Sequence, residues 1–258
     1  KKILNGKKQK VSWESKTMNV LIPMAGRGSR FATQGYTFPK PLIDVKGKPM
    51  IQVVVDNLNI KAKYTFIVQK EHYEKYSLQY LLNLIAPDCN IVQVDGITEG
   101  AACTTLLAKE FIDNDEPLLM ANSDQFVEWD SNETLYAFSN GDCDGGILTF
   151  PASHPKWSYA KLDDDGFVSE VAEKKPISEH ATVGVYWWKK GSDYVKYAEQ
   201  MIEKNIRTNG EFYVCPVFNE AIGDDKRIRI KEIDKDGMWG IGTPEDLNYF
   251  LKNYEGDI

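Results

Sequence analysis

The sequence is poor in the residues that build disulfide and zinc scaffolds. Its 258 residues include four cysteines and three histidines, and no two cysteines stand in a C-x-x-C spacing. We therefore expect reduced thiols and no Cys/His metal site. No run approaches the roughly 18 apolar residues that a membrane helix needs. The main apolar run, residues 20–25, has the length of a strand. We therefore expect a cytoplasmic protein without membrane association.

Positive charge is also scarce in the body of the chain. The formal net charge is −7, and six of the 31 lysines and arginines fall in residues 1–17, which hold one acid, Glu14. The remainder is therefore more acidic than the whole. Nucleic-acid affinity rests on neutralisation of phosphates by Lys and Arg, so no nucleic-acid partner is expected. An anionic ligand would have to be held by a few well-placed cations.

Residues 1–17 precede the first strong apolar run, which Met18 opens. They lack the apolar core of a signal peptide. Two interpretations stay open for them. They form a linker or the tail of an upstream domain, or they are a short extension packed on the body through Val11 and Trp13. The main domain is placed at residues 18–258.

Strand and helix patterns alternate over the first 150 residues. Short β-rich apolar runs are found at 19–23, 64–68, 90–94, 117–121 and 146–150, and segments of helical period at 50–58, 71–85 and 100–111. Strands that alternate with helices need crossover connections, which are typical of a parallel sheet covered by helices. The pattern predicts an α/β fold with a mixed, mostly parallel sheet.

The second half of the chain has a different pattern, with extended segments followed by helices. The extended segments are 160–162, 167–172 and 182–188, and the helical ones 192–204, 211–222 and 244–254. The acidic run 163–165 predicts a solvated hairpin turn. Trp187 and Trp188 point to opposite faces of a strand, so we expect one in the core and one at the surface. This half predicts an insertion that covers one end of the sheet.

A glycine-rich loop follows the first strand. Gly26 and Gly28 allow close approach of the backbone to a phosphate, and Arg30 supplies a planar cation able to grip phosphate oxygens. Phe31 stands where the G-x-G-x-x-G motif needs glycine, and no G-x-x-x-x-G-K-[ST] occurs. The loop therefore predicts a phosphate cradle of another kind.

Two further motifs follow the loop at short spacing. F-P-K-P-L at 38–42 places Lys40 between two prolines, which restrict its backbone, and G-K-P-M-I follows at 47–51. With G-x-G-S-R-F at 26–31, this order resembles the sugar nucleotidyltransferase family. The resemblance extends over most of residues 18–255. It implies a three-layer, Rossmann-like nucleotide-binding fold of the glycosyltransferase-A type with an acceptor-binding insertion.

The resemblance also implies roles for individual residues. Those expected to bind the nucleotide are Ala25, Gly26, Arg27, Gly28, Ser29, Glu99, Gly100 and Ser123. The strand-end residue Asp124 is expected to hold Mg²⁺. Catalytic cations are expected at Arg30, Lys40 and Lys174. The acceptor is expected to meet Tyr159, Glu173, Gly184 and Glu211.

The sequence departs from the family pattern at three points. The usual tyrosine-glycine is Tyr159-Ala160, and the usual Glu-Lys-Pro has a second lysine inserted, Lys175. Gly240 stands where many relatives carry a second metal-binding aspartate. Either one protein carboxylate suffices, with phosphate and water as further Mg²⁺ ligands, or another acid, Glu211 or Asp236, reaches the site.

The implied reaction is in-line attack by an acceptor phosphate on the α-phosphorus of a nucleoside triphosphate, with release of pyrophosphate. The attacking phosphate is already an anion, so the reaction needs positioning and cations, not a general base. The leading interpretation is transfer to a sugar 1-phosphate, which gives an NDP-sugar for surface polysaccharide. The alternatives are a cytidylyltransferase acting on a small non-sugar phosphate, a glycosyltransferase of related fold, and a nucleotide-sensing module without catalysis. A homo-oligomer is left open.

Overall fold

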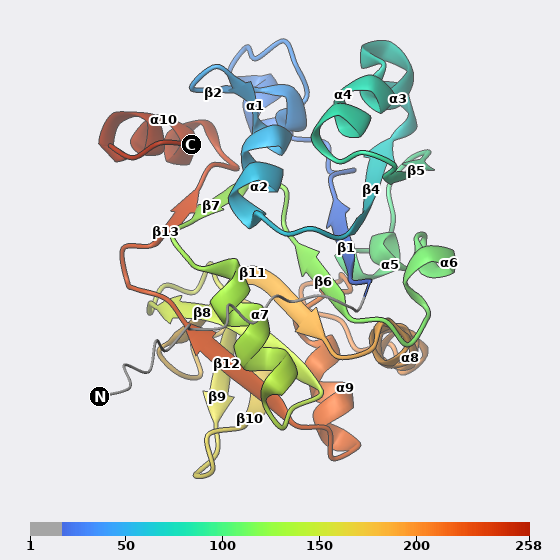
Figure 1. The fold of residues 1–258 in the computed structure, drawn as a ribbon, viewed down its shortest axis with the longest axis vertical. Helices are drawn as coiled ribbons and strands as arrows, with labels where there is room; N and C mark the ends of the chain where they lie inside the picture. Colours follow the sequence, from blue (N-terminus) through green and yellow to red (C-terminus); the bar gives the residue numbers. More distant parts are fainter. Residues whose placement is uncertain (1–16) are drawn as a thin grey trace, which may run out of the picture.

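A mixed β-sheet runs through the centre of the molecule, with helices on both of its faces (Figure 1). The computed structural model describes residues 17–258. The two interpretations of the N-terminal segment concern residues that lie, all but Thr17, outside the described part. Among the helices formed by residues 17–258, none has both the length and the apolar content needed to cross a bilayer.

One half of the sheet is parallel. It contains β1 (Asn19–Pro23), β4 (Lys63–Gln69), β5 (Asn90–Val94) and β6 (Leu118–Ala121) in the order β6-β1-β4-β5. The strand pairs β1–β4, β1–β6 and β4–β5 are all parallel. The alternation of strands and helices in the first half of the sequence predicted this arrangement, and the structure confirms it.

The other half of the sheet is mostly antiparallel. It contains β8 (Gly145–Pro151), β9 (Tyr159–Leu162), β10 (Val168–Ala172), β11 (His180–Trp188) and β12 (Ile228–Glu232). The long strand β11 pairs antiparallel with β6, β8 and β9, and so joins the two halves. The acidic run 163–165 forms the exposed turn between β9 and β10, as predicted.

Helices cover each face of the sheet and bury a core there. On one face lie α2 (Met50–Leu58), α3 (Lys70–Tyr76), α4 (Leu78–Ile85) and α7 (Ser131–Asn140). On the other lie α5 (Ala101–Leu106), α6 (Lys109–Ile112), α8 (Gly191–Glu203) and α9 (Val217–Gly223). The expected three-layer fold is therefore present.

A third, smaller apolar cluster lies between short N-terminal elements and the last helix. These elements are at the upper end of the molecule in Figure 1. Phe31 and Phe250 are both fully buried in this cluster. The elements that build this region are α1 (Ser29–Thr33), the 3-10 helix η1 (Lys40–Leu42), β2 (Asp44–Val45), β3 (Lys48–Pro49), β7 (Gln125–Val127), β13 (Met238–Gly240) and α10 (Pro244–Asn253). They fix the region that follows the glycine-rich loop against the C-terminal part of the chain.

The expectation that one of the two adjacent tryptophans lies at the surface was wrong. Trp187 and Trp188 are both 1% exposed, because β11 is covered on both faces. Trp187 packs in the core with α7, where its ring stacks on Phe138. Trp188 packs in the opposite core, and its ring centroid lies 4.4 Å from that of Phe218.

The helix predicted at 211–222 begins later than expected. α9 starts at Val217, directly after Pro216. The preceding residues cannot be helical because the backbone of Phe212 is engaged elsewhere, donating to Glu99 O and accepting from Ala102 N. The helix predicted at 71–85 is also divided, since Ser77 adopts a φ of +49° between α3 and α4.

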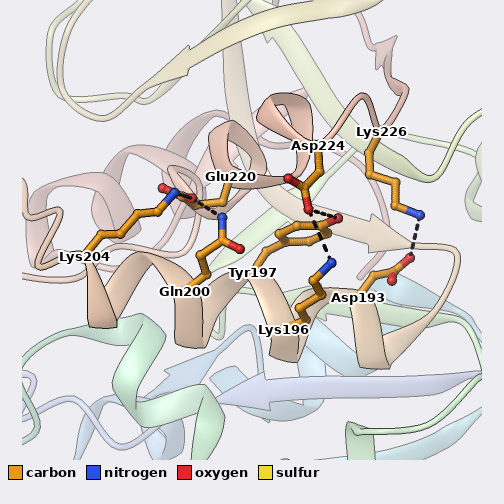
Figure 2. Close-up of polar contacts among 8 residues, drawn as sticks. All are labelled: Asp193, Lys196, Tyr197, Gln200, Lys204, Glu220, Asp224 and Lys226. Carbon is orange, nitrogen blue, oxygen red and sulfur yellow. Dashed lines mark hydrogen bonds and ion pairs between the residues drawn. The ribbon is translucent and has the colours of Figure 1, made fainter.

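Polar side chains connect α8 to α9 and the turn that follows it (Figure 2). Glu220 is 8% exposed and accepts hydrogen bonds from Gln200 Nε2 at 2.5 Å and Lys204 Nζ at 2.7 Å. Asp224 accepts from Tyr197 OH at 3.1 Å and Lys196 Nζ at 3.3 Å. These contacts fix the position of α9 on α8.

Candidate active site

A cavity of about 420 Å³ opens at the carboxyl ends of the parallel strands. Residues that end or follow each strand contribute to its wall, including Ala25 after β1, Gln69 at the end of β4, Gly96 after β5 and Asn122 after β6. The carboxyl edge of an open α/β sheet is where such folds bind ligands. The cavity also receives Glu211 from the second half of the chain.

The glycine-rich loop forms one wall of the cavity through Ala25, Gly26 and Arg27. Gly28 lies at the N-terminus of α1 with a φ of +58°, and a Cβ atom there would lie 3.1 Å from Lys40 Cβ. Glycine therefore serves both the left-handed backbone and the close approach of Lys40. Ser29 is the first residue of α1.

Lys40 and Asp124 meet in the cavity wall as an ion pair. Lys40 Nζ lies 2.7 Å from Asp124 Oδ2, and the two side chains are 19% and 31% exposed. Gly242 leaves room for the carboxylate, since a Cβ atom there would lie 2.4 Å from Asp124 Oδ2. The structure thus brings together a predicted catalytic cation and the predicted metal ligand, and both remain reachable from solvent.

Residues 98–102, the base loop, are expected by resemblance to lie against the nucleotide base. Thr98, Gly100 and Ala101 of this loop line the cavity, as does Ser123 after β6. Gly100 has a φ of +137°, and a Cβ atom there would lie 2.5 Å from the backbone N and O of Phe212. Glu99 instead pairs with Arg207, with 2.9 Å between Glu99 Oε1 and Arg207 Nη2. The close packing of Gly100 on Phe212 fixes the backbone of this loop at the cavity.

The expected acceptor residues are divided between the cavity and its surroundings. Glu211 lines the cavity, while Tyr159 is fully buried and donates to His154 O at 2.6 Å. Gly184 has a φ of +91°, and a Cβ atom there would lie 2.1 Å from Asn122 Nδ2. Gly184 thus admits the Asn122 side chain, which lines the cavity.

Glu173 and Lys174, which directly follow β10, lie in different environments. Burial raises the pKa of the Glu173 carboxyl, and Lys174 and a hydrogen bond with Ser158 oppose the shift. The Lys174 ammonium donates to Tyr213 OH at 2.7 Å, and this bond raises the pKa of Lys174. Lys174 therefore stays charged through the neutral pH range.

Arg30 lies apart from the other predicted cations. Its exposed side chain lines a separate hollow of about 360 Å³ with residues of the segment 243–245. The structure does not bring Arg30 to the cavity that holds Lys40, Arg27 and Asp124. The expectation that Arg30 is a catalytic cation stays a prediction.

The donor set of the cavity suits a hard cation with few protein ligands. Among residues 17–258 no group of three or more His, Cys, Asp and Glu is arranged to hold a metal ion. Asp124 offers one carboxylate, and Mg²⁺ commonly completes its shell with phosphate and water. Of the two alternative acids, Glu211 lines the cavity. Beside Gly240, the carboxylate Oδ2 of Asp246 lies 3.6 Å from where a Cβ atom would stand.

Sequence reasoning missed two residues that organise the site. Gln69 Nε2 donates to Ala25 O at 2.5 Å and to Gly96 O at 3.0 Å, so one side chain connects two walls of the cavity. Tyr213 connects Lys174 to Glu211. The position of Gln69 at the end of a parallel strand was a usable signal. Nothing local in the sequence distinguishes Tyr213.

Comparisons with solved structures agree with this architecture. A nucleoside-diphosphate-sugar pyrophosphorylase from Vibrio cholerae RC9 superposes with a TM-score of 0.77 at 24% identity, over 91% of this chain and 100% of that one. An inositol-1-phosphate CTP transferase from T. maritima gives 0.71 at 12% identity, over 94% and 99%. At these identities the likeness establishes the fold.

Curated proteins of related sequence are longer than this chain. The "Bifunctional protein GlmU" of Methanocaldococcus jannaschii is 26% identical over 251 residues, which are 93% of this chain and 56% of that protein. The "Low-salt glycan biosynthesis nucleotidyltransferase Agl11" of Haloferax volcanii is 26% identical over 240 residues, 89% and 64% respectively. The chain thus spans less than two thirds of either relative. The family model described as "Nucleotidyl transferase" matches residues 19–254, and the chain therefore belongs to the nucleotidyl transferase family of enzymes.

Proposed function

We propose that the protein transfers a nucleoside monophosphate from a nucleoside triphosphate to a sugar 1-phosphate, releasing pyrophosphate and forming an NDP-sugar. The observation that carries this proposal is the cavity at the carboxyl edge of the sheet, where the Lys40–Asp124 ion pair faces the glycine-rich loop. A triphosphate needs hydrogen-bond donors and cations around its phosphates and an acid beside them that can hold a metal ion. The residues of the cavity wall supply each of these.

The chain's own residues orient two anions for in-line attack. Backbone N–H groups at Gly26 and Gly28 donate to the triphosphate, and Lys40 neutralises charge that grows on the leaving pyrophosphate. Lys174 meets the phosphate of the acceptor. No residue removes a proton, because the attacking phosphate oxygen is already deprotonated. The protein thereby lowers the barrier through position and charge.

We further propose that Asp124 holds Mg²⁺ together with phosphate and water oxygens. When bound, Mg²⁺ would neutralise the triphosphate and stabilise the charge on its leaving part. Two acids, Asp124 and Glu211, line the cavity, and a polyanion would be repelled by them without an intervening cation. The ion pair with Lys40 keeps the Asp124 carboxylate oriented into the cavity wall.

A second candidate keeps the chemistry and changes the acceptor to a small non-sugar phosphate, with CTP as donor. The second lysine after Glu173 and the glycine at position 240 favour it, because both lie in segments tied to the acceptor or the metal by resemblance. A structural neighbour is named an inositol-1-phosphate CTP transferase.

For the first candidate, we also propose that the NDP-sugar is used in surface polysaccharide synthesis and that the protein acts in the cytoplasm. The name of the Haloferax relative, a glycan biosynthesis nucleotidyltransferase, supports the glycan context.

A substrate panel tests both candidates. Purified protein is incubated with each of CTP, UTP, dTTP, GTP and ATP and with sugar 1-phosphates or small alcohol phosphates, and pyrophosphate release is measured with and without Mg²⁺. Release with a sugar 1-phosphate supports the first candidate, and release restricted to CTP with a non-sugar phosphate supports the second. Nucleotide binding without pyrophosphate from any pair would contradict both.

A further inference from the structure

Three side chains form a continuous polar chain beside the cavity. Lys174 Nζ donates to Tyr213 OH at 2.7 Å, and Tyr213 OH donates to Glu211 Oε2 at 2.9 Å. The ammonium also lies 4.8 Å from the centre of the Tyr213 ring. Glu211 lines the cavity that the nucleotide is proposed to fill. The phenol hydroxyl therefore stands between a lysine outside the cavity lining and an acid within it.

Lys174 is placed by its backbone as well as by this contact. Its φ of +55° lies in the left-handed region, which a residue other than glycine adopts at some cost in energy. The four-carbon stem of lysine is flexible and loses much conformational freedom when its ammonium is fixed. A second group that fixes the ammonium before the acceptor binds would remove part of that cost from binding.

The segment that carries Tyr213 is anchored to the base loop, residues 98–102. Phe212 N donates to Glu99 O at 3.0 Å, and Phe212 O accepts from Ala102 N at 2.9 Å. Arg207 reinforces the anchor, with its guanidinium carbon 4.1 Å from the Phe212 ring centre and its Nη2 paired to Glu99. Phe212 thus holds the base loop, and the next residue, Tyr213, holds Lys174, the cation expected to meet the acceptor.

We propose that Tyr213 is a positioning residue that sets the place of the Lys174 ammonium relative to the nucleotide cavity. The inference rests on the proposed function, since it assigns Lys174 to the acceptor phosphate. The hydroxyl of Tyr213 holds the Lys174 ammonium near Glu211 in the cavity wall. The backbone of Phe212 bonds to Glu99 and Ala102, so the same segment is also fixed to the base loop. One short segment thereby fixes the distance between the sites for the two substrates.

The Tyr213→Phe substitution tests this proposal because it removes the hydroxyl and keeps the ring. We expect catalytic efficiency toward the acceptor to fall by about tenfold or more, as for loss of a hydrogen bond to a charged group. The KM for the nucleoside triphosphate should stay unchanged. In a Lys174→Ala background the same substitution should have no further effect, since the two groups act together. Tyr80→Phe, at a tyrosine 75% exposed on α4, is the matched control.

A binding measurement separates this proposal from the reaction itself. Lysines are ¹³C-dimethylated, the Lys174 signal is assigned with Lys174→Arg, and inorganic phosphate is titrated by NMR. We expect the Lys174 signal to shift with phosphate in the wild type and to need higher phosphate in Tyr213→Phe. Equal phosphate responses in the two proteins, or additive losses in the double variant, would overturn the role of Tyr213. A phosphate response in a protein that releases no pyrophosphate would refute the proposed reaction and leave the positioning role standing.

Discussion

Lys40 and Asp124, 84 residues apart in the sequence, are joined by a 2.7 Å ion pair in the wall of the cavity. Under the proposed function each partner would bind a different ligand, the ammonium a phosphate and the carboxylate a metal ion. Their mutual pairing keeps both charges oriented at the cavity without a bound ligand. Because the two side chains are only partly exposed, removal of one partner leaves the charge of the other unpaired in a partly buried position.

Lys40→Ala should reduce kcat by at least about 100-fold while the fold persists, because loss of one preorganised donor or cation costs roughly 2.7–4 kcal/mol of barrier. Steady-state rates of pyrophosphate release, with circular dichroism as a check of folding, measure this. Lys252→Ala, at an exposed lysine near the end of α10, should keep the wild-type rate. A rate within threefold of wild type for Lys40→Ala would argue against its catalytic role.

Gly100→Ala should weaken nucleotide binding and lower stability by more than about 1 kcal/mol, because alanine is strained at positive φ. At φ +137° the new Cβ atom would lie 2.5 Å from the Phe212 backbone and push the 207–213 segment away from the loop. Urea unfolding and calorimetric titration with a nucleoside triphosphate report the two effects. Gly223→Ala is the control, since a Cβ atom there meets nothing within 4 Å; wild-type behaviour of Gly100→Ala would refute the close packing.

Glu220 should make stability depend on pH below its ordinary pKa of 4.5. Burial opposes its charged form, but hydrogen bonds from Lys204 and Gln200 outweigh burial and lower the pKa in the folded state (Figure 2). The unfolded chain therefore binds a proton first as pH falls. The stabilisation is complete well above pH 4.5 and disappears as pH drops through the lowered pKa of the folded state.

Glu220→Gln should remove that acid-dependent part of the free energy of unfolding and cost about 1–3 kcal/mol at neutral pH. Urea unfolding from pH 7 to pH 3 measures both quantities. Glu203→Gln, at an exposed residue on α8, should follow the wild-type curve. Parallel curves for wild type and Glu220→Gln across this range would show that the α8–α9 contacts do not depend on the charge of Glu220.

Gly240→Asp should create a metal-dependent stability. Gly240 does not have a positive φ, so a side chain is tolerated there. The new Cβ atom would lie 3.6 Å from Asp246 Oδ2, which places the two carboxylates side by side. Two like charges should lower the melting temperature without metal, and Mn²⁺ or Mg²⁺ should restore it. Thermal unfolding with and without metal measures this, and Gly240→Asn supplies the same volume without charge. An identical metal response in both variants would contradict the prediction.

The local patterns of the chain predicted most of the sheet and part of the site. The runs at 19–23 and 90–94 form β1 and β5, and the segment 50–58 forms α2, since period and composition are local properties. The glycine-rich loop was predicted as a phosphate cradle because it follows the first strand, and Asp124 was predicted by resemblance to the family. The structure places both at the cavity. Contacts between distant segments were not visible in the sequence. The apolar spacing after Glu211 favoured a helix, but pairing of Phe212 with residues more than 100 positions earlier prevents it.

The strand β11 belongs to both halves of the sheet, bonded to β8 on one edge and to β6 and β9 on the other. Neither half can release it without exposing unpaired backbone groups and one of the adjacent tryptophans to water. The parallel half and the mostly antiparallel half of the sheet therefore share one cooperative unit of unfolding. A chain ending before residue 180 would leave β6 as a bare, apolar edge, open to pairing with other molecules.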